Sequence, residues 1–229
     1  MPKGPRFGDI RACVFDAFGT LFDIHGTIAC LHARIGPSAD AFSQLWRRKQ
    51  LEYTWLRALM DRHGDFWQVT EDALDHTLDT FAIDDPALRH DLLESYLRID
   101  AFPEAAPALE QLKRGGFEVA ILSNGTPHML EAALIHNALT DRVDHVWSIE
   151  EIGVYKPDPG VYRLPVDRLQ LEPAQILFAS ANAWDVAGAS SVGLFAVWIN
   201  RDGAKRDRLP NRPDAEIAAL ADLPRLLGS

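Results

Sequence analysis

The sequence predicts an α/β protein with a parallel sheet, helices on both faces of that sheet, and a helical subdomain inserted after the first strand. Short apolar runs, each typical of a buried strand, alternate along the chain with amphipathic helical stretches. These runs are Ala12–Phe15, Glu118–Leu122, His145–Ser148, Ile176–Ala179 and Phe195–Ile199. Strands that alternate with helices form parallel sheets covered on both faces, so we expect a Rossmann-like core.

The first apolar run is the strongest strand signal. Ala12–Phe15 is followed directly by Asp16, and Gly19 with Thr20 comes shortly afterwards. This order is typical of a buried strand that feeds a loop. We expect this strand at the centre of the sheet.

The segment between the first two strands is too long for one crossover helix. It contains no convincing strand, and apolar residues recur in it at helical spacing in three parts, residues 41–60, 71–83 and 86–99. We therefore predict a helical cap over residues 24–99 and a core domain of residues 1–23 and 100–229. The cap is expected over the carboxyl ends of the strands, where open α/β sheets bind ligands.

Composition and charge exclude several classes of protein. The 229 residues are 47% hydrophobic and 24% charged, which is typical of a globular protein with a buried core. The net charge is −10 without a cluster of basic residues, so we expect no nucleic-acid partner. The polar first ten residues predict neither a signal peptide nor a membrane span, and hence a cytoplasmic protein. Cys13 and Cys30 form no C-x-x-C pair, and we expect both to be reduced core residues.

Polar side chains follow four of the predicted strands or begin a helix. Asp16 ends the first strand, where it is either a turn residue or a functional carboxylate. Ser123 and Asn124 end the second, where they cap a helix, bind an anion, or do both. Lys156 lies between stiffening prolines, although a lone lysine is usually solvated. The loop Ser180–Asp185 carries a hydroxyl, an amide, an indole and a carboxylate.

This order of Asp, Ser/Asn, Lys and Asp at successive strand ends resembles the haloacid dehalogenase superfamily over nearly the whole chain. Most members of that superfamily are magnesium phosphatases with a second Asp two positions after the nucleophile. Here Phe18 occupies that position, and Ser180 and Asn182 stand where phosphatases commonly place acids. A hard Mg²⁺ ion needs several oxygen ligands, so we expect no metal and no other cofactor.

The departures match the L-2-haloacid dehalogenases, the metal-independent branch of the superfamily. The similar segments are Asp16–Asp23, Ser123–Gly125, Tyr155–Asp158, Ser180–Asp185 and, in the cap, Trp46–Arg57. The cap segment implies that Arg47 is the arginine on the halide side, whereas position on the helix alone favours Arg48 equally. The subgroup usually has Tyr where this chain has Phe18.

The resemblance implies hydrolysis of short-chain L-2-haloalkanoic acids to D-2-hydroxyalkanoic acids. Asp16 attacks C2 of the substrate and forms an ester, which water then hydrolyses. Lys156 keeps Asp16 ionised, and Arg47 receives the charge that grows on the halide. Asp185, aided by Asn182, Ser180 and Lys156, activates the water. Alternatively, Asp185 is structural and holds Lys156 or the loop.

The remaining predicted site residues bind the substrate. Ser123 and the backbone amides around Ala17, Phe18 and Asn124 are expected to hold the substrate carboxylate. Leu51, Phe66 and Trp184 are expected to exclude water and to contact the alkyl chain, although Phe66 and Trp184 are also interpretable as ordinary core aromatics. We include Thr20 with the catalytic residues and Tyr162 with the substrate-binding residues.

The sequence leaves two alternative functions and also predicts the ligands and a partner subunit. A magnesium-dependent phosphatase acting on a small phosphate ester is the alternative enzyme, and a catalytically silent binding or scaffold protein is the alternative class. The expected ligands are a 2-haloacid anion and the halide product. The resemblance implies a homodimer, for which the aromatic cap helix that contains Trp46, Tyr53 and Trp55 is one candidate surface. The alternative is that these side chains pack within the cap.

Overall fold

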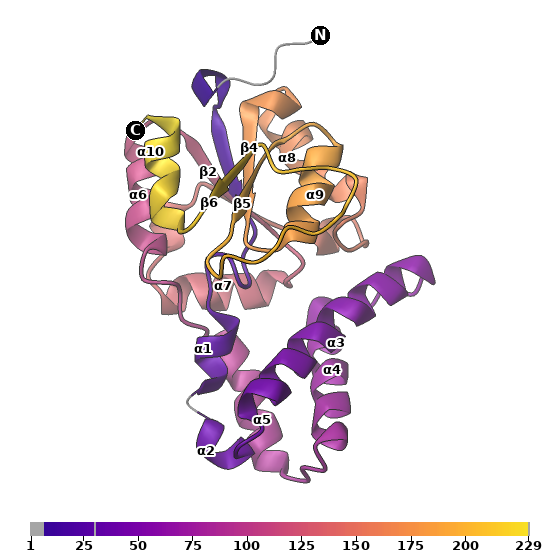
Figure 1. The fold of residues 1–229 in the computed structure, drawn as a ribbon. Helices are drawn as coiled ribbons and strands as arrows, with labels where there is room; N and C mark the ends of the chain where they lie inside the picture. The colour runs from indigo at the N-terminus through magenta and orange to yellow at the C-terminus, as the bar shows by residue number, and fades with distance from the viewer. Residues whose placement is uncertain (1–6, 30, 229) are drawn as a thin grey trace.

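A computed structural model describes residues 7–29 and 31–228, and its core is one six-stranded sheet in the order β3-β2-β1-β4-β5-β6. All neighbouring strands are parallel. Their bounds are β1 Ala12–Phe15, β2 Glu118–Ser123, β3 His145–Ser148, β4 Ile176–Ser180, β5 Phe195–Ile199 and β6 Ala215–Ile217. The five predicted strands are all present, and the predicted fold class is confirmed (Figure 1).

The first strand lies inside the sheet because it pairs with β2 on one side and β4 on the other. All four of its residues are fully buried, as expected for a strand covered on both faces. Cys13 is one of them, it is a free thiol, and burial raises its pKa. Cys30 lies outside the described residues. The strand β6 was not predicted, because its three residues include the charged Glu216 and form no apolar run.

Helices cover both faces of the sheet (Figure 1). Two helices, α6 and α10, lie on one side of the sheet, and α8 and α9 lie on the other, whereas α7 packs against β3 and against the cap helix α5. Their bounds are α6 Ala105–Arg114, α7 Pro127–His136, α8 Pro159–Leu169, α9 Ala183–Ser191 and α10 Leu223–Leu227. The described residues also form five 3₁₀ turns, η1 Phe7–Asp9, η2 Thr140–Arg142, η3 Ile149–Glu151, η4 Pro173–Gln175 and η5 Leu220–Asp222.

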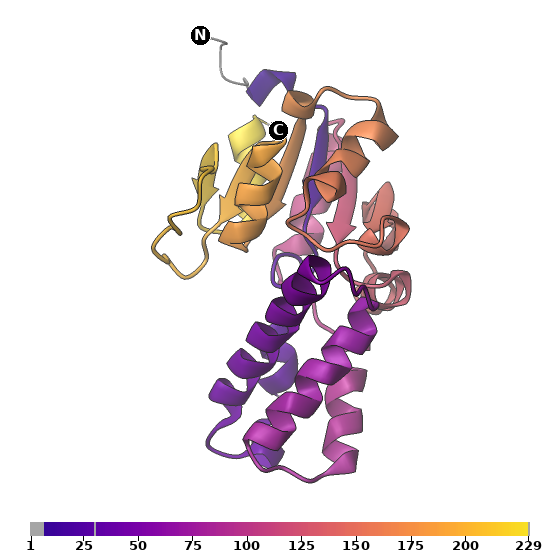
Figure 2. The ribbon, with the colours of Figure 1, turned by 90° about the vertical axis from the view of Figure 1, so that its right-hand side faces the viewer.

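The inserted segment forms a helical bundle beyond one end of the sheet, as Figure 2 shows from the side. Its helices are α1 Ile24–Ala29, α2 His32–Ile35, α3 Ala39–Leu59, α4 Phe66–Thr80 and α5 Pro86–Leu97. The second predicted helix was expected from residue 71, but α4 begins five residues earlier, because the Asp65 side chain accepts a hydrogen bond from the Gln68 amide and caps the helix. Trp46 is buried among Phe42 and Tyr96, so this side chain packs within the cap.

Two chain segments connect the bundle to the sheet, and they hydrogen-bond to each other. The Asp23 amide donates to the Asp100 carbonyl at 2.8 Å, and the Phe102 amide donates to the Leu21 carbonyl at 2.9 Å. The two connecting segments therefore lie side by side at residues 21–23 and 100–102. The division into residues 24–99 and the two flanking parts stays a prediction.

Arg201, in the turn after β5, ties these connecting segments to the loop that follows β1. Its guanidinium donates to the carbonyls of Gly19 at 3.2 Å and Thr20 at 2.9 Å, and it pairs with Glu104 at 3.0 Å. The same group lies 3.7 Å from the centroid of the Phe102 ring. One largely buried cation therefore holds the loop that carries the first strand-end carboxylate against the base of the cap.

We expect Arg201→Met to lower the free energy of unfolding by about 1–3 kcal/mol, because it leaves Glu104 and two carbonyls without their donor. The control is Arg206→Met in the same loop, since Arg206 is exposed and its loss should change the stability by less than about 0.5 kcal/mol. Urea unfolding of both variants measures this, and equal effects would contradict the role given to Arg201.

Candidate active site

Asp16 lies at the carboxyl end of β1, where the residue is 7% exposed. The Asp16 amide donates to the Ala179 carbonyl at 3.0 Å, which continues the pairing of β1 with β4 one residue past the strand. The neighbouring parallel strands end at Ser123 and Ser180, so the three polar side chains meet at one edge of the sheet. The sequence predicted this convergence.

The two oxygens of the Asp16 carboxylate have different surroundings. Oδ2 accepts hydrogen bonds from the Thr20 hydroxyl at 2.9 Å, the Asn182 amide at 3.0 Å and the Ser180 hydroxyl at 3.4 Å. Oδ1 accepts from the Lys156 ammonium at 3.1 Å. Four predicted catalytic residues therefore contact Asp16 directly, and three of them share one oxygen.

Lys156 is a buried cation between two carboxylates. Its Nζ lies 3.1 Å from Asp16 Oδ1 and 3.0 Å from Asp185 Oδ2, and the residue is 1% exposed. The ammonium also lies 4.9 Å from the centroid of the Phe178 ring. The Asn124 side-chain carbonyl accepts a hydrogen bond from the Lys156 backbone amide at 3.1 Å and so holds its loop. The interpretation of Lys156 as a solvated surface lysine is wrong.

Asp185 is completely buried, and burial raises its pKa to about 6. The positive charge of Lys156 and the hydroxyl of Tyr162, which donates to Oδ1 at 2.7 Å, act in the opposite direction, whereas the negative charge of Asp16 raises this pKa further. Burial and Asp185 raise the pKa of Tyr162. Tyr162, predicted as a substrate-binding residue, is therefore placed with its hydroxyl on Asp185.

The residues predicted to hold the substrate carboxylate lie where β1 and β2 end. Among the described residues, the backbone N–H groups of Ala17, Phe18 and Asn124 donate to no protein acceptor. The Ser123 hydroxyl is buried and accepts a hydrogen bond from the Gly125 amide at 3.1 Å. Helix α7 is capped by a residue that the prediction did not consider, because the Thr126 hydroxyl accepts from the Met129 amide. Ser123 and Asn124 thus do not act as its N-cap.

The cap contributes Arg47 to the same region. This half-buried side chain donates from Nη2 to the Phe18 carbonyl at 3.3 Å and from Nη1 to Gln50 Oε1 at 2.6 Å. Its neighbour Arg48 is exposed. The two arginines were equivalent by sequence position, and the structure directs Arg47 toward the loop after β1.

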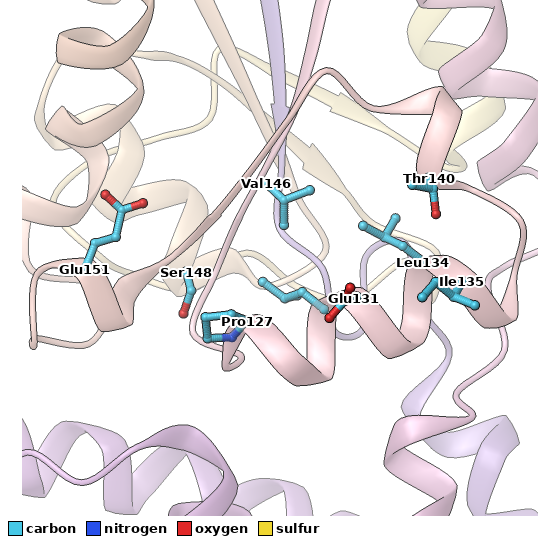
Figure 3. Close-up of a pocket in the computed structure, with 9 residues that line it drawn as sticks. Pro127, Glu131, Leu134, Ile135, Thr140, Val146, Ser148 and Glu151 are labelled. Carbon is cyan, nitrogen blue, oxygen red and sulfur yellow. The ribbon is translucent and has the colours of Figure 1, made fainter.

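A cavity of about 360 Å³ lies between cap and core, and Arg47, Leu51 and Asn182 are among the residues that line it. Phe66 is buried, with its ring centroid 6.1 Å from that of Phe18, and Trp184 packs edge-on against Trp55 of the cap at 5.4 Å. All three predicted apolar residues therefore lie between cap and core. A separate cavity of about 430 Å³ lies between α7 and β3 (Figure 3), and none of the predicted site residues lines it.

The donor set around Asp16 does not fit a metal ion. Lys156 occupies the space between the two carboxylates, and residues 7–29 and 31–228 contain no group of three or more His, Cys, Asp or Glu side chains arranged to hold a metal.

No helix in the described part of the chain is long and apolar enough to cross a membrane.

Comparison with known proteins decides the family. Residues 10–193 match the model of the haloacid dehalogenase-like hydrolases. The chain belongs to this family. It is 44% identical over 220 residues to (S)-2-haloacid dehalogenase 1 of Pseudomonas sp. (strain CBS-3), a match that covers 95% of this chain and 96% of that protein. The resemblance to the L-2-haloacid dehalogenase subgroup is thereby confirmed.

Two solved structures of dehalogenases have the same fold. A dehalogenase with an intermediate complex superimposes with a TM-score of 0.95 at 41% identity, covering 96% of this chain and 98% of that one. The L-2-haloacid dehalogenase of Xanthobacter autotrophicus with covalently bound chloropropionic acid superimposes with a TM-score of 0.89 at 36% identity, covering 96% and 99%.

The sequence reading missed two residues of the dehalogenase-like site. Gln50 contacts Arg47 from one helical turn away, and the i, i+3 spacing of the two residues was a visible signal. Arg201 supports the Asp16 loop from a distant turn, and no sequence pattern connects it to that loop.

The raised pKa of Asp185 has a consequence for stability. Below about pH 3.8 both the folded and unfolded states hold the proton, whereas between about pH 3.8 and 6 the folded state keeps a proton that the unfolded state has lost. Stability due to this group therefore falls as the pH rises through that window. Asp185→Asn does not titrate, so the unfolding free energy of the parent minus that of this variant should fall by about 2 kcal/mol between pH 4 and 6. Urea unfolding at several pH values measures it, and a difference that rises with pH would show that Lys156 outweighs burial.

Proposed function

We propose that the protein hydrolyses short-chain L-2-haloalkanoic acids to D-2-hydroxyalkanoic acids through an ester on Asp16. The observation that carries this proposal is the asymmetry of the Asp16 carboxylate, with a buried ammonium on one oxygen and three neutral donors on the other. The names of its relatives, (S)-2-haloacid dehalogenases, support the same substrate class.

The attacking atom is Oδ1 of Asp16. A carboxylate oxygen has two lone-pair directions, and the three donors at Oδ2 use both, whereas Oδ1 accepts only from Lys156 in the described structure. Oδ1 therefore keeps a lone pair for C2 of the substrate. Its burial removes competing water, which is required because a hydrated carboxylate is a poor nucleophile.

Displacement at C2 forms the bond between Oδ1 and carbon and breaks the carbon–halogen bond, and the halide leaves with the electron pair. Arg47 reaches the loop after β1 and stabilises the charge that develops on the halide. Because the substrate is an anion and the net charge of the protein is −10, capture depends on local donors. The unused amides of Ala17, Phe18 and Asn124, together with Ser123, hold the substrate carboxylate.

Water then attacks Cγ of the Asp16 ester, and the charge of the tetrahedral intermediate develops on Oδ2. The Thr20, Ser180 and Asn182 donors already surround that oxygen, so they serve this step without rearranging. One proton of the water passes to Asp185, while Lys156 protonates the departing alkoxide at Oδ1 and regains a proton from Asp185. The second water proton is left on the new carboxyl group of Asp16 and is released to solvent, which restores the carboxylate. Asp185 thus both holds Lys156 and acts as the base.

The magnesium phosphatase alternative is less supported. Phe18 has no acidic group to protonate a leaving alcohol, and its ring lies among Phe22, Phe66 and Tyr96. Lys156 also occupies the place between the carboxylates that a metal ion would need. A purely structural or scaffold role has no comparable support, since the buried site keeps a complete set of charged and polar groups.

Two predictions about the whole protein remain proposals. A cytoplasmic location follows from the sequence reading alone. Trp46 is buried inside the cap and Trp55 packs against Trp184, so a homodimer would use the α3 surface near the half-buried Tyr53.

Dehalogenation should survive removal of metal ions. We expect release of chloride from L-2-chloropropionate at an unchanged rate after dialysis against EDTA, and no hydrolysis of p-nitrophenyl phosphate with or without added Mg²⁺. Halide and p-nitrophenol are measured side by side on the same preparation. Loss of chloride release with EDTA, or phosphate-ester cleavage that needs Mg²⁺, would favour the phosphatase instead.

A further inference from the structure

Gln50 is a fully buried polar side chain in the cap, and both ends of its amide are hydrogen-bonded. Its Oε1 accepts from Arg47 Nη1 at 2.6 Å and, at 3.4 Å, from the Tyr96 hydroxyl. Its Nε2 donates to the Thr70 hydroxyl at 2.7 Å. Gln50 therefore connects α3, which carries Arg47, to α4.

The partners of Gln50 fix which end of its side-chain amide donates and which end accepts. A guanidinium donates and never accepts, so the carbonyl end of Gln50 must face Arg47 and its amide nitrogen must face Thr70. The Thr70 hydroxyl then gives its own proton to the Phe66 carbonyl, at 2.6 Å. The chain from Arg47 through Gln50 and Thr70 thus ends at Phe66, whose ring packs against Phe18.

We propose that Gln50 is a positioning residue for carbon–halogen cleavage, and that it fixes the direction in which Arg47 points. This inference rests on the proposed function, in which Arg47 receives the halide. The second protein contact of Arg47 is the longer bond to the Phe18 carbonyl at 3.3 Å, and the side chain is only half-buried. Gln50 supplies the shorter contact, so it restricts a side chain that otherwise has many rotamers.

The orientation of Arg47 should matter more for chloride than for bromide, because chloride is the poorer leaving group. Donors that stabilise developing charge are effective when they are already in place, and a misplacement of about 1 Å costs about 100-fold in rate. Chloride leaves less readily than bromide and gains more from a well-aligned donor. Loss of the Gln50 contact should therefore slow chloride release more than bromide release.

The first variant is Gln50→Leu, assayed by the rate of halide release in the first turnover of L-2-chloropropionate and L-2-bromopropionate. We expect the rate with the chloro substrate to fall about 10-fold to 100-fold, and the bromo-to-chloro rate ratio to increase several-fold. A loss of folded enzyme would lower both rates equally and leave this ratio unchanged.

A matched pair in α4 keeps the test independent of the folding of Gln50→Leu. Thr70 and Thr77 are both fully buried, and each donates its hydroxyl proton to the carbonyl four residues before it, at 2.6 and 2.7 Å. Only Thr70 also accepts from Gln50. Thr70→Val should therefore increase the bromo-to-chloro ratio, and Thr77→Val should leave it at the parent value.

Arg47→Lys separates this inference from the proposed function. An increased ratio in Arg47→Lys with parent ratios in Gln50→Leu and Thr70→Val would overturn the inference and leave the proposed function standing. A parent ratio in Arg47→Lys would overturn both, because Arg47 would then not receive the halide. Equal ratios for the two threonine variants would also overturn the role of Gln50.

Discussion

The buried ammonium of Lys156 is the interaction on which the rest of this site depends. Two carboxylates, Asp16 and Asp185, lie with almost no exposure to water at the same edge of the sheet, and the cation lies about 3 Å from each. Removing one member of such a buried group typically costs about 3–5 kcal/mol, because the remaining charge loses its partner. The negative charge of Asp16 can therefore stay dry only while Lys156 is held in place.

Several parts of the fold hold that ammonium. The Asn124 side chain at the end of β2 fixes the backbone of Lys156, and the Phe178 ring in β4 faces its ammonium group. Tyr162 in α8 occupies the oxygen of Asp185 that Lys156 does not use. Parallel strands bring these residues to one edge, while the cap adds Arg47 and apolar side chains. In the proposed reaction the α/β core thus supplies the nucleophile, and the helical bundle supplies the group that receives the halide.

The sequence was sufficient for features that are local or periodic. Apolar runs predicted five strands, a break in that pattern predicted the inserted helices, and strand-end positions predicted that Asp16, Ser123, Lys156 and Ser180 converge. The strand β6 was missed because it is short and carries Glu216, and the start of α4 was placed late because the cap at Asp65 was not considered.

Other features depend on tertiary contacts that no periodic pattern reports. Whether Arg47 or Arg48 turns toward the core depends on how α3 packs against α4, and both arginines have the same local sequence environment. The same applies to Tyr162, whose hydroxyl faces Asp185, and to Arg201, which acts on a loop about 180 residues away in sequence. The contact between Gln50 and Thr70 joins two helices and was likewise invisible until the bundle was assembled.

The most direct measurement follows the oxygen atoms through one turnover. Excess enzyme is mixed with L-2-chloropropionate in ¹⁸O water, and the peptide containing Asp16 and the hydroxyacid product are weighed by mass spectrometry. Attack by Asp16 at carbon, followed by attack of water at Cγ, predicts that the heavy isotope enters the Asp16 peptide while the new hydroxyl of the product stays light. Heavy oxygen in the product with a light Asp16 peptide would contradict the account, because water would then have displaced the halide itself.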